Sequence, residues 1–215
     1  MLRWIENPGE NVVLVRGNHD EEFRCYVEVM GMIFQKRRME TSSGKDTISV
    51  YQTARQLSPY FDVYGTVGNL VKERKVSFEK LSEWARCIGK MPYFYEVVMN
   101  GKRCIIVHGG FIESLTCLEG TDTDGSYDSL EDFYLKARDD AYIYGGVEHG
   151  MIIAGHTPTT AMYELPFNHG NVYRAYDEEL DCIFYDLDCG YTFKSIRPEA
   201  KLACLRLEDE RIFYV

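Results

Sequence analysis

Three short, strongly apolar runs in this chain each end at a turn that carries a histidine, and this feature limits the possible folds most. The runs and their histidines are Val12–Val15 with His19, Ile105–Val107 with His108, and Met151–Ala154 with His156. Short runs rich in valine and isoleucine that stop at glycine indicate strands buried on both faces. Such strands gather ligand-binding groups at their carboxyl ends in α/β and layered folds. We therefore expect the three imidazoles to converge on one site.

The residue types at these turns indicate a metal. Asn18 precedes His19 and supplies a hard amide oxygen beside the imidazoles. Imidazole together with amide oxygen suits a first-row or borderline divalent ion such as manganese, iron or zinc, whereas thiolate-rich sets are typical of structural zinc. The motifs therefore indicate metal-assisted chemistry.

Length and charge limit the class of protein. A chain of 215 residues is long enough for one well-formed core, and we expect a single domain over residues 1–215. The 24 basic and 34 acidic residues give a formal net charge of -10, which disfavours a surface for the phosphate backbone of nucleic acid. We expect no nucleic-acid partner.

The cysteines and the apolar stretches indicate the compartment. The seven cysteines are odd in number and contain no Cys-x-x-Cys pair, which is typical of a reducing compartment. No leader-like segment opens the chain, and no apolar stretch approaches the ~20 residues of a membrane helix. The expectation is a cytoplasmic protein that does not associate with membranes.

The pattern between the motifs predicts the remaining elements. Helical spacing runs over residues 21–30, 47–57, 77–88 and 128–137, with Ser77 and Gly89 as the caps of the third helix. Asn100 and Gly101 predict a two-residue hairpin turn between strands 93–99 and 102–107, and three or four further strands follow residue 172. Residues 21–92 form a helical insertion that either caps the site or packs around the sheet.

The ordered motifs resemble the calcineurin-like metallophosphoesterases, in the serine/threonine phosphoprotein phosphatase branch of bacterial type. They are Arg-Gly-Asn-His-Asp at residues 16–20, His-Gly-Gly at 108–110 and Gly-His-Thr at 155–157. The strand at 201–207 that follows Asp-Cys-Gly at 188–190 resembles the end of bacterial members. The resemblance implies an α/β (α+β) fold, the four-layer α/β/β/α sandwich, here incomplete at its N-terminus.

The resemblance also implies roles for the motif residues. Asn18, His108 and His156 would bind the second of two divalent ions, manganese, iron or zinc, and His19 would be the general acid for the leaving oxygen. The implied activity is hydrolysis of a phosphomonoester by a metal-activated water. The implied substrate is a phosphoprotein or a small phosphoester.

Four further residues have two readings each. Arg138 resembles the arginine of a Trp-x-Arg segment near the substrate phosphate, with lysine in place of the tryptophan, or it forms a surface pair. Asp188 resembles an aspartate that orients a metal-bound imidazole, or it caps a turn. His149 and His169 follow no apolar run and are expected to be solvated loop residues rather than ligands.

Two motifs of the family are absent. The family begins with Gly-Asp-x-His-Gly and Gly-Asp-x-x-Asp-Arg-Gly, neither of which occurs here, and only sixteen residues precede Gly17. We therefore expect a truncated domain with half of a two-metal site, unless Met1 is a misplaced start. The alternatives are a hydrolase of diadenosine tetraphosphate or another small nucleotide on the same fold, and an inactive truncated phosphatase that acts as a binding module.

Overall fold

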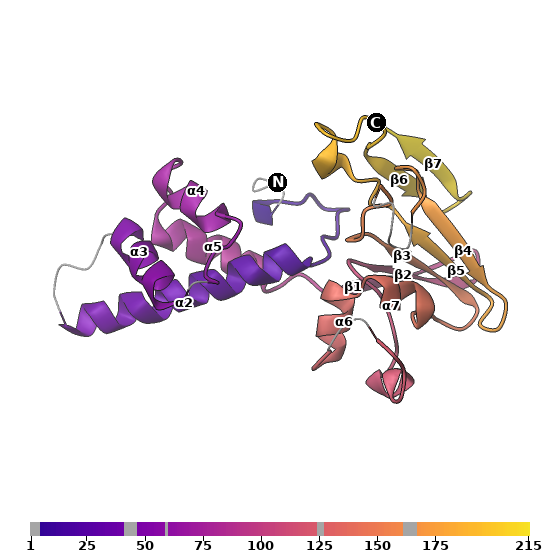
Figure 1. The fold of residues 1–215 in the computed structure, drawn as a ribbon, viewed down its shortest axis with the longest axis horizontal. Helices are drawn as coiled ribbons and strands as arrows, with labels where there is room; N and C mark the ends of the chain where they lie inside the picture. Colours follow the sequence, from indigo (N-terminus) through magenta and orange to yellow (C-terminus); the bar gives the residue numbers. More distant parts are fainter. Residues whose placement is uncertain (1–4, 41–46, 59, 124–126, 161–166) are drawn as a thin grey trace. The chain divides into compact units, whose positions relative to one another are not determined.

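The chain divides into two compact units in the computed structural model, which describes residues 5–40, 47–58, 60–123, 127–160 and 167–215 (Figure 1). Unit 1 comprises residues 1–14 and 18–91, and unit 2 comprises residues 15–17 and 92–215. The physical reason for the division is that each described cluster of buried apolar side chains lies within one unit, so that each unit encloses its own core. The single domain over residues 1–215 stays a prediction.

Unit 1 consists of four helices named in Figure 1, which are α2 (Asn18–Glu40), α3 (Thr47–Leu57), α4 (Thr66–Lys72) and α5 (Phe78–Ile88). The helices predicted at 21–30, 47–57 and 77–88 are confirmed. Ser77 is the predicted N-cap of α5, because its side chain accepts a hydrogen bond from the Lys80 amide at 3.3 Å. Gly89 follows as the C-cap.

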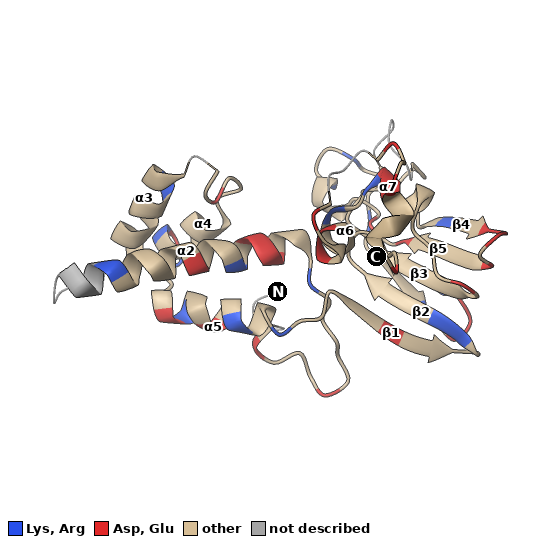
Figure 2. Ribbon diagram, turned by 90° about the horizontal axis from the view of Figure 1, so that it is seen from below, with Lys and Arg blue, Asp and Glu red and all other residues tan. Residues whose placement is uncertain are grey.

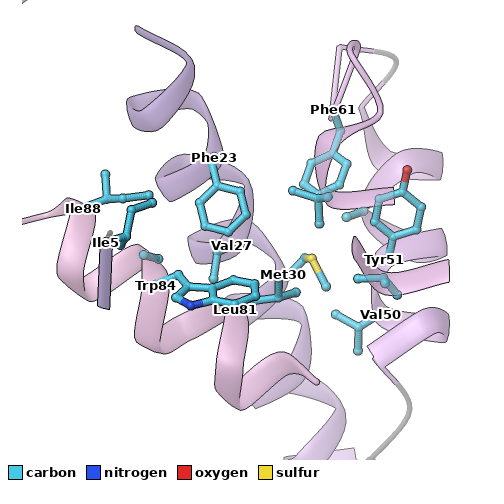
Figure 3. Close-up of a cluster of buried hydrophobic side chains, with 14 residues drawn as sticks. Ile5, Phe23, Val27, Met30, Val50, Tyr51, Phe61, Leu81, Trp84 and Ile88 are labelled. Carbon is cyan, nitrogen blue, oxygen red and sulfur yellow. The ribbon is translucent and has the colours of Figure 1, made fainter. Parts of the chain in front are cut away.

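The core of unit 1 lies where α2 packs against α3 and α5 (Figure 3). Phe23, Val27 and Met30 follow one another at helical spacing on α2 and are all buried. Leu81 and Trp84 meet them from α5. The amphipathic spacing read from the sequence therefore produces this helical core.

Both acidic and basic residues occur along α2 and α5 (Figure 2). On α2, Arg24 forms ion pairs with Glu21 and Glu28. Glu21 also lies in the first turn, where an acidic side chain is stabilised by the helix dipole. The ion pair with Arg24 and the helix dipole thus explain the position of Glu21 without a metal ion.

Unit 2 contains a five-stranded mixed sheet of order β1-β2-β3-β5-β4. Its strands are β1 (Phe94–Met99), β2 (Lys102–Val107), β3 (Gly150–Ala154), β4 (Tyr173–Asp177) and β5 (Cys182–Asp186). The three central strands β2, β3 and β5 are parallel, and the edge strands pair antiparallel to them. The predicted hairpin is confirmed, because Asn100 and Gly101 connect β1 to β2 with φ of 53° and 79°, as a type I′ turn requires.

Two different layers cover the faces of this sheet. The helices α6 (Leu130–Lys136) and α7 (Asp139–Ile143) pack on one face, and the hairpin of β6 (Ala203–Arg206) and β7 (Arg211–Tyr214) packs on the other. Short 3-10 helices occur at Leu115–Leu118 and Tyr191–Phe193. The fold is therefore mixed α/β, as predicted, and the described part of unit 2 has three layers. The finer four-layer arrangement stays a prediction.

The run Val12–Val15 does not form the predicted strand. A strand needs a paired neighbour, and among the described residues no strand pairs with this run. Val13 is 49% exposed, and the next residue, Arg16, donates its amide hydrogen to the Pro92 carbonyl at 2.9 Å. The apolar run is thus a connecting segment rather than a core strand.

Among the helices of the described segments, none is both long enough and apolar enough to cross a membrane.

Candidate functional site

The carboxyl ends of β2, β3 and β5 lie at one edge of the sheet because these strands are parallel. His108 directly follows β2, His156 follows β3 after one glycine, and Asp188 lies two residues beyond β5. The amide of Gly155 donates to the carbonyl of His108 at 3.0 Å, which ties the first two turns together. The prediction of strand-end histidines is confirmed for these two residues.

The rings of His108 and His156 approach each other, with centroids 4.8 Å apart and planes inclined at 57°. An imidazole nitrogen binds zinc at about 2.1 Å, which places the ring centroid about 3.2 Å from the ion. Two imidazoles bound at an angle of about 90° to 110° then have centroids about 4.5 to 5.2 Å apart. The observed separation fits two ligands of a single ion.

The backbone at His156 is held in an uncommon conformation. Its φ is 71°, and the amide of Thr157 donates back to the carbonyl of Gly155 at 2.8 Å across it. This is the pattern of a γ-turn with positive φ, which is rare and strained for a residue with a side chain. Strain of this kind gathers at functional sites, where the surroundings hold a side chain in a required direction.

A second three-residue turn presents Asp188. The amide of Cys189 donates to the carbonyl of Leu187 at 2.9 Å, so that Asp188 lies at the tip. A Cβ atom at Gly155 would lie 3.9 Å from the Cβ atom of Asp188, and the two tips are therefore neighbours. The carboxylate of Asp188 accepts the Gly190 amide at 2.9 Å, so the turn-capping role is present, while orientation of an imidazole stays a prediction.

Arg138 lies between α6 and α7, and its positive charge acts on the Asp188 carboxylate at this edge of the sheet. Burial raises the pKa of Asp188, and the positive charge of Arg138 partly offsets that rise. The side chain of Arg138 is exposed, and no ion pair holds it within the described ranges. The surface-pair reading therefore has no support in the described residues, and phosphate binding stays a prediction.

The two glycines after His108 allow the connection between α6 and α7 to pack directly on this turn. Gly109 donates its amide to the carbonyl of Tyr134 at 2.7 Å. A Cβ atom at Gly110 would lie 2.6 Å from that of Ala141. The His-Gly-Gly motif therefore places Arg138 as well as His108.

The sequence analysis did not predict the hydrogen-bonded pair of Asp186 and Tyr142, which lies next to the Asp188 turn. Asp186 is fully buried, accepts a hydrogen bond from the Tyr142 hydroxyl, and accepts the Asp188 amide at 2.7 Å. Burial raises the pKa of Asp186 to about 8 and also raises the pKa of Tyr142. The sequence did contain a signal for this pair, because Asp186 ends an otherwise apolar strand. A carboxyl group buried at such a position needs hydrogen-bond partners.

Asn18 and His19 belong to a different element from the predicted strand end. They form the first turn of α2 instead of a strand end, because the preceding run is not a strand. His19 is exposed, and its ring meets that of Tyr64 edge to face at 5.0 Å. Asn18 belongs to unit 1 and the two converging histidines to unit 2, so a shared ion stays a prediction.

The remaining histidines and the cysteines add no further ligand to the pair of His108 and His156 among the described residues. His149 and His169 are exposed, as predicted, and all seven cysteines are free. Within the part of the chain that the structure describes, no three histidine, cysteine or acidic side chains are grouped as a metal site. The two imidazoles thus fit an ion as two of its ligands, and an amide oxygen or water would have to supply the others.

No model of a known protein family matches this chain, and no curated protein has a matching sequence.

Proposed function

We propose that this protein is a metal-dependent phosphoesterase of the serine/threonine phosphatase type, which hydrolyses a phosphomonoester. The observation that carries the proposal is the 4.8 Å approach of His108 and His156 from adjacent parallel strands. The order of the three motifs along the chain supports it independently.

His108 and His156 would hold one divalent ion. A bound divalent ion supplies charge for phosphate oxygens and lowers the pKa of a water to near neutrality. Arg138 would bind the phosphate, since a guanidinium matches phosphate oxygens with two parallel hydrogen bonds. Asp188 would fix the direction of an imidazole from the neighbouring turn.

His19 would donate the proton that the leaving oxygen takes up. Its imidazole is exposed and so is accessible to a substrate. A ring N–H of an imidazole can donate a proton to a leaving oxygen within hydrogen-bond reach. This role needs no coordination to the ion, and the two kinds of residue can therefore be separated experimentally.

A second candidate is a binding module without turnover. It is favoured by the lack of a third grouped histidine, cysteine or acidic ligand among the residues described. A two-metal phosphoesterase clamps its substrate between ions about 3.5 to 4 Å apart. One weakly held ion would bind an anion without rapid hydrolysis.

Metal content tests the site without reference to activity. The full chain is loaded with Mn²⁺ or Zn²⁺, desalted, and analysed by mass spectrometry of the metal, and affinities are measured by calorimetry. His108→Asn and His156→Asn should each weaken binding at least about tenfold, a loss of about 1.4 kcal/mol. His149→Asn is the matched control, because His149 is an exposed histidine of the same unit. Equal losses in the control and the site variants would contradict the site.

Turnover tests the reaction and separates the alternatives. The substrates are p-nitrophenyl phosphate, a phosphoserine peptide and diadenosine tetraphosphate. His19→Asn should lower turnover about 10²- to 10⁴-fold with metal content preserved. Preference for the dinucleotide would identify the small-nucleotide hydrolase, and metal binding without hydrolysis of any substrate would support the binding module.

A further inference from the structure

Unit 1 contains a cavity of about 270 Å³. Its walls come from α2, α4, α5 and the segment before α2, all within unit 1. The residues that matter for its chemistry are Ile5, His19, Phe23, Tyr26, Leu70 and Ile88. The cavity therefore exists within one unit and does not depend on the placement of the other.

The inner wall of the cavity is apolar. Phe23 and Ile88 are 7% and 2% exposed, and Ile5 lies beside them (Figure 3). Tyr26 and Leu70 extend this wall and are half-buried. Apolar and aromatic walls with a few polar groups are typical of small-molecule sites.

The volume indicates the size of the ligand. A 150 Å³ cavity lined by leucine, isoleucine and phenylalanine binds benzene. The cavity of unit 1, at about 270 Å³, is nearly twice as large. It therefore accommodates two fused rings rather than one.

The polar side of the cavity lies at the beginning of α2. His19 lines it there, with the ring of Tyr64 against its imidazole. Asp62 also lines the cavity, but its carboxylate accepts the Tyr51 hydroxyl and the Gly68 amide, both within 2.9 Å. Asp62 thus fixes the loop before α4. Asp20, Glu22 and Thr66 also line the cavity, and His19 is the imidazole among these polar residues that can donate to a ligand oxygen.

We propose that this cavity binds a two-ring aromatic group whose single oxygen lies at His19. This binding involves residues of unit 1 alone.

The binding test uses 2-naphthol with the metal-free full chain, measured by calorimetry. We expect saturable one-to-one binding that is at least about tenfold tighter than that of phenol. Leu70→Trp fills the cavity and should weaken 2-naphthol binding at least about tenfold, and Leu70→Phe should weaken it less. Leu57→Trp is the control, since Leu57 is 72% exposed on α3 and should leave the affinity unchanged. Absence of saturable binding, or equal affinities of Leu70→Trp, Leu70→Phe and wild type, would overturn the proposal.

Discussion

The buried carboxyl group of Asp186 should make unit 2 less stable as the pH rises, and Asp186→Asn should remove that dependence. Burial raises the pKa of Asp186 in the folded chain from 3.8 to about 8, because an ionised carboxylate is poorly solvated there. In the unfolded chain the group is ionised above about pH 4. Between these two values the folded state therefore binds one proton more than the unfolded state.

The sign and the size follow from this proton difference. A folded pKa above the unfolded one gives stability that is complete at low pH and is lost as pH rises toward the folded pKa. One proton corresponds to about 1.4 kcal/mol per pH unit, or about 2 kcal/mol between pH 5.5 and 7. The difference in unfolding free energy between Asp186→Asn and wild type should change by that amount, in favour of the variant at higher pH.

Hydrogen exchange of the β3 and β5 amides gives the measurement, because these amides report on unit 2 alone. Comparison at equal pH cancels the intrinsic exchange rate. Glu96→Gln is the control, since hydrogen bonds from Arg103 lower the pKa of Glu96 and keep it ionised over this range. Parallel free-energy curves for Asp186→Asn and wild type would refute the argument, because they would mean that Asp186 is ionised in the folded chain at pH 5.5.

Three other substitutions test local structure. Gly110→Ala should destabilise unit 2 by about 1 to 3 kcal/mol in urea unfolding, since its Cβ atom would lie 2.6 Å from that of Ala141, and an unchanged midpoint would contradict this packing. Ser77→Ala should cost about 1 kcal/mol, measured by the fluorescence of Trp84 on the same helix, and Ser77→Gly should cost only a few tenths if the cap is the cause. His156→Gly should be more stable than His156→Ala by about 1 kcal/mol in thermal melts, because glycine adopts a φ of 71° without strain, and equal melting would mean that the turn relaxes.

Local chemistry determined the elements that the sequence predicts correctly. The helix α5 is fixed by an N-cap at Ser77, an apolar face at helical spacing and a following glycine, all of which act within a dozen residues. The hairpin of β1 and β2 is fixed by the turn preference of Asn100 and Gly101. The strand-end positions of His108 and His156 follow from runs short enough to be buried on both faces.

The site was predictable only in part, because its remaining groups are set by contacts between distant segments. Tyr142 and Asp186 are 44 residues apart and meet only through the packing of α7 on the sheet. The γ-turn at His156 likewise depends on a chain path that no local propensity specifies.

The run Val12–Val15 and the division into units show most clearly what tertiary structure decided. By composition this run is as apolar as β3, and the sequence therefore predicts a strand. A strand is stabilised by a paired neighbour as well as by its own residues, and the sheet of unit 2 pairs its own strands with one another. The apolar pattern of the sequence thus determined which segments are apolar enough for burial. The neighbouring segments in the folded chain decided which of these segments form strands and which core each helix belongs to.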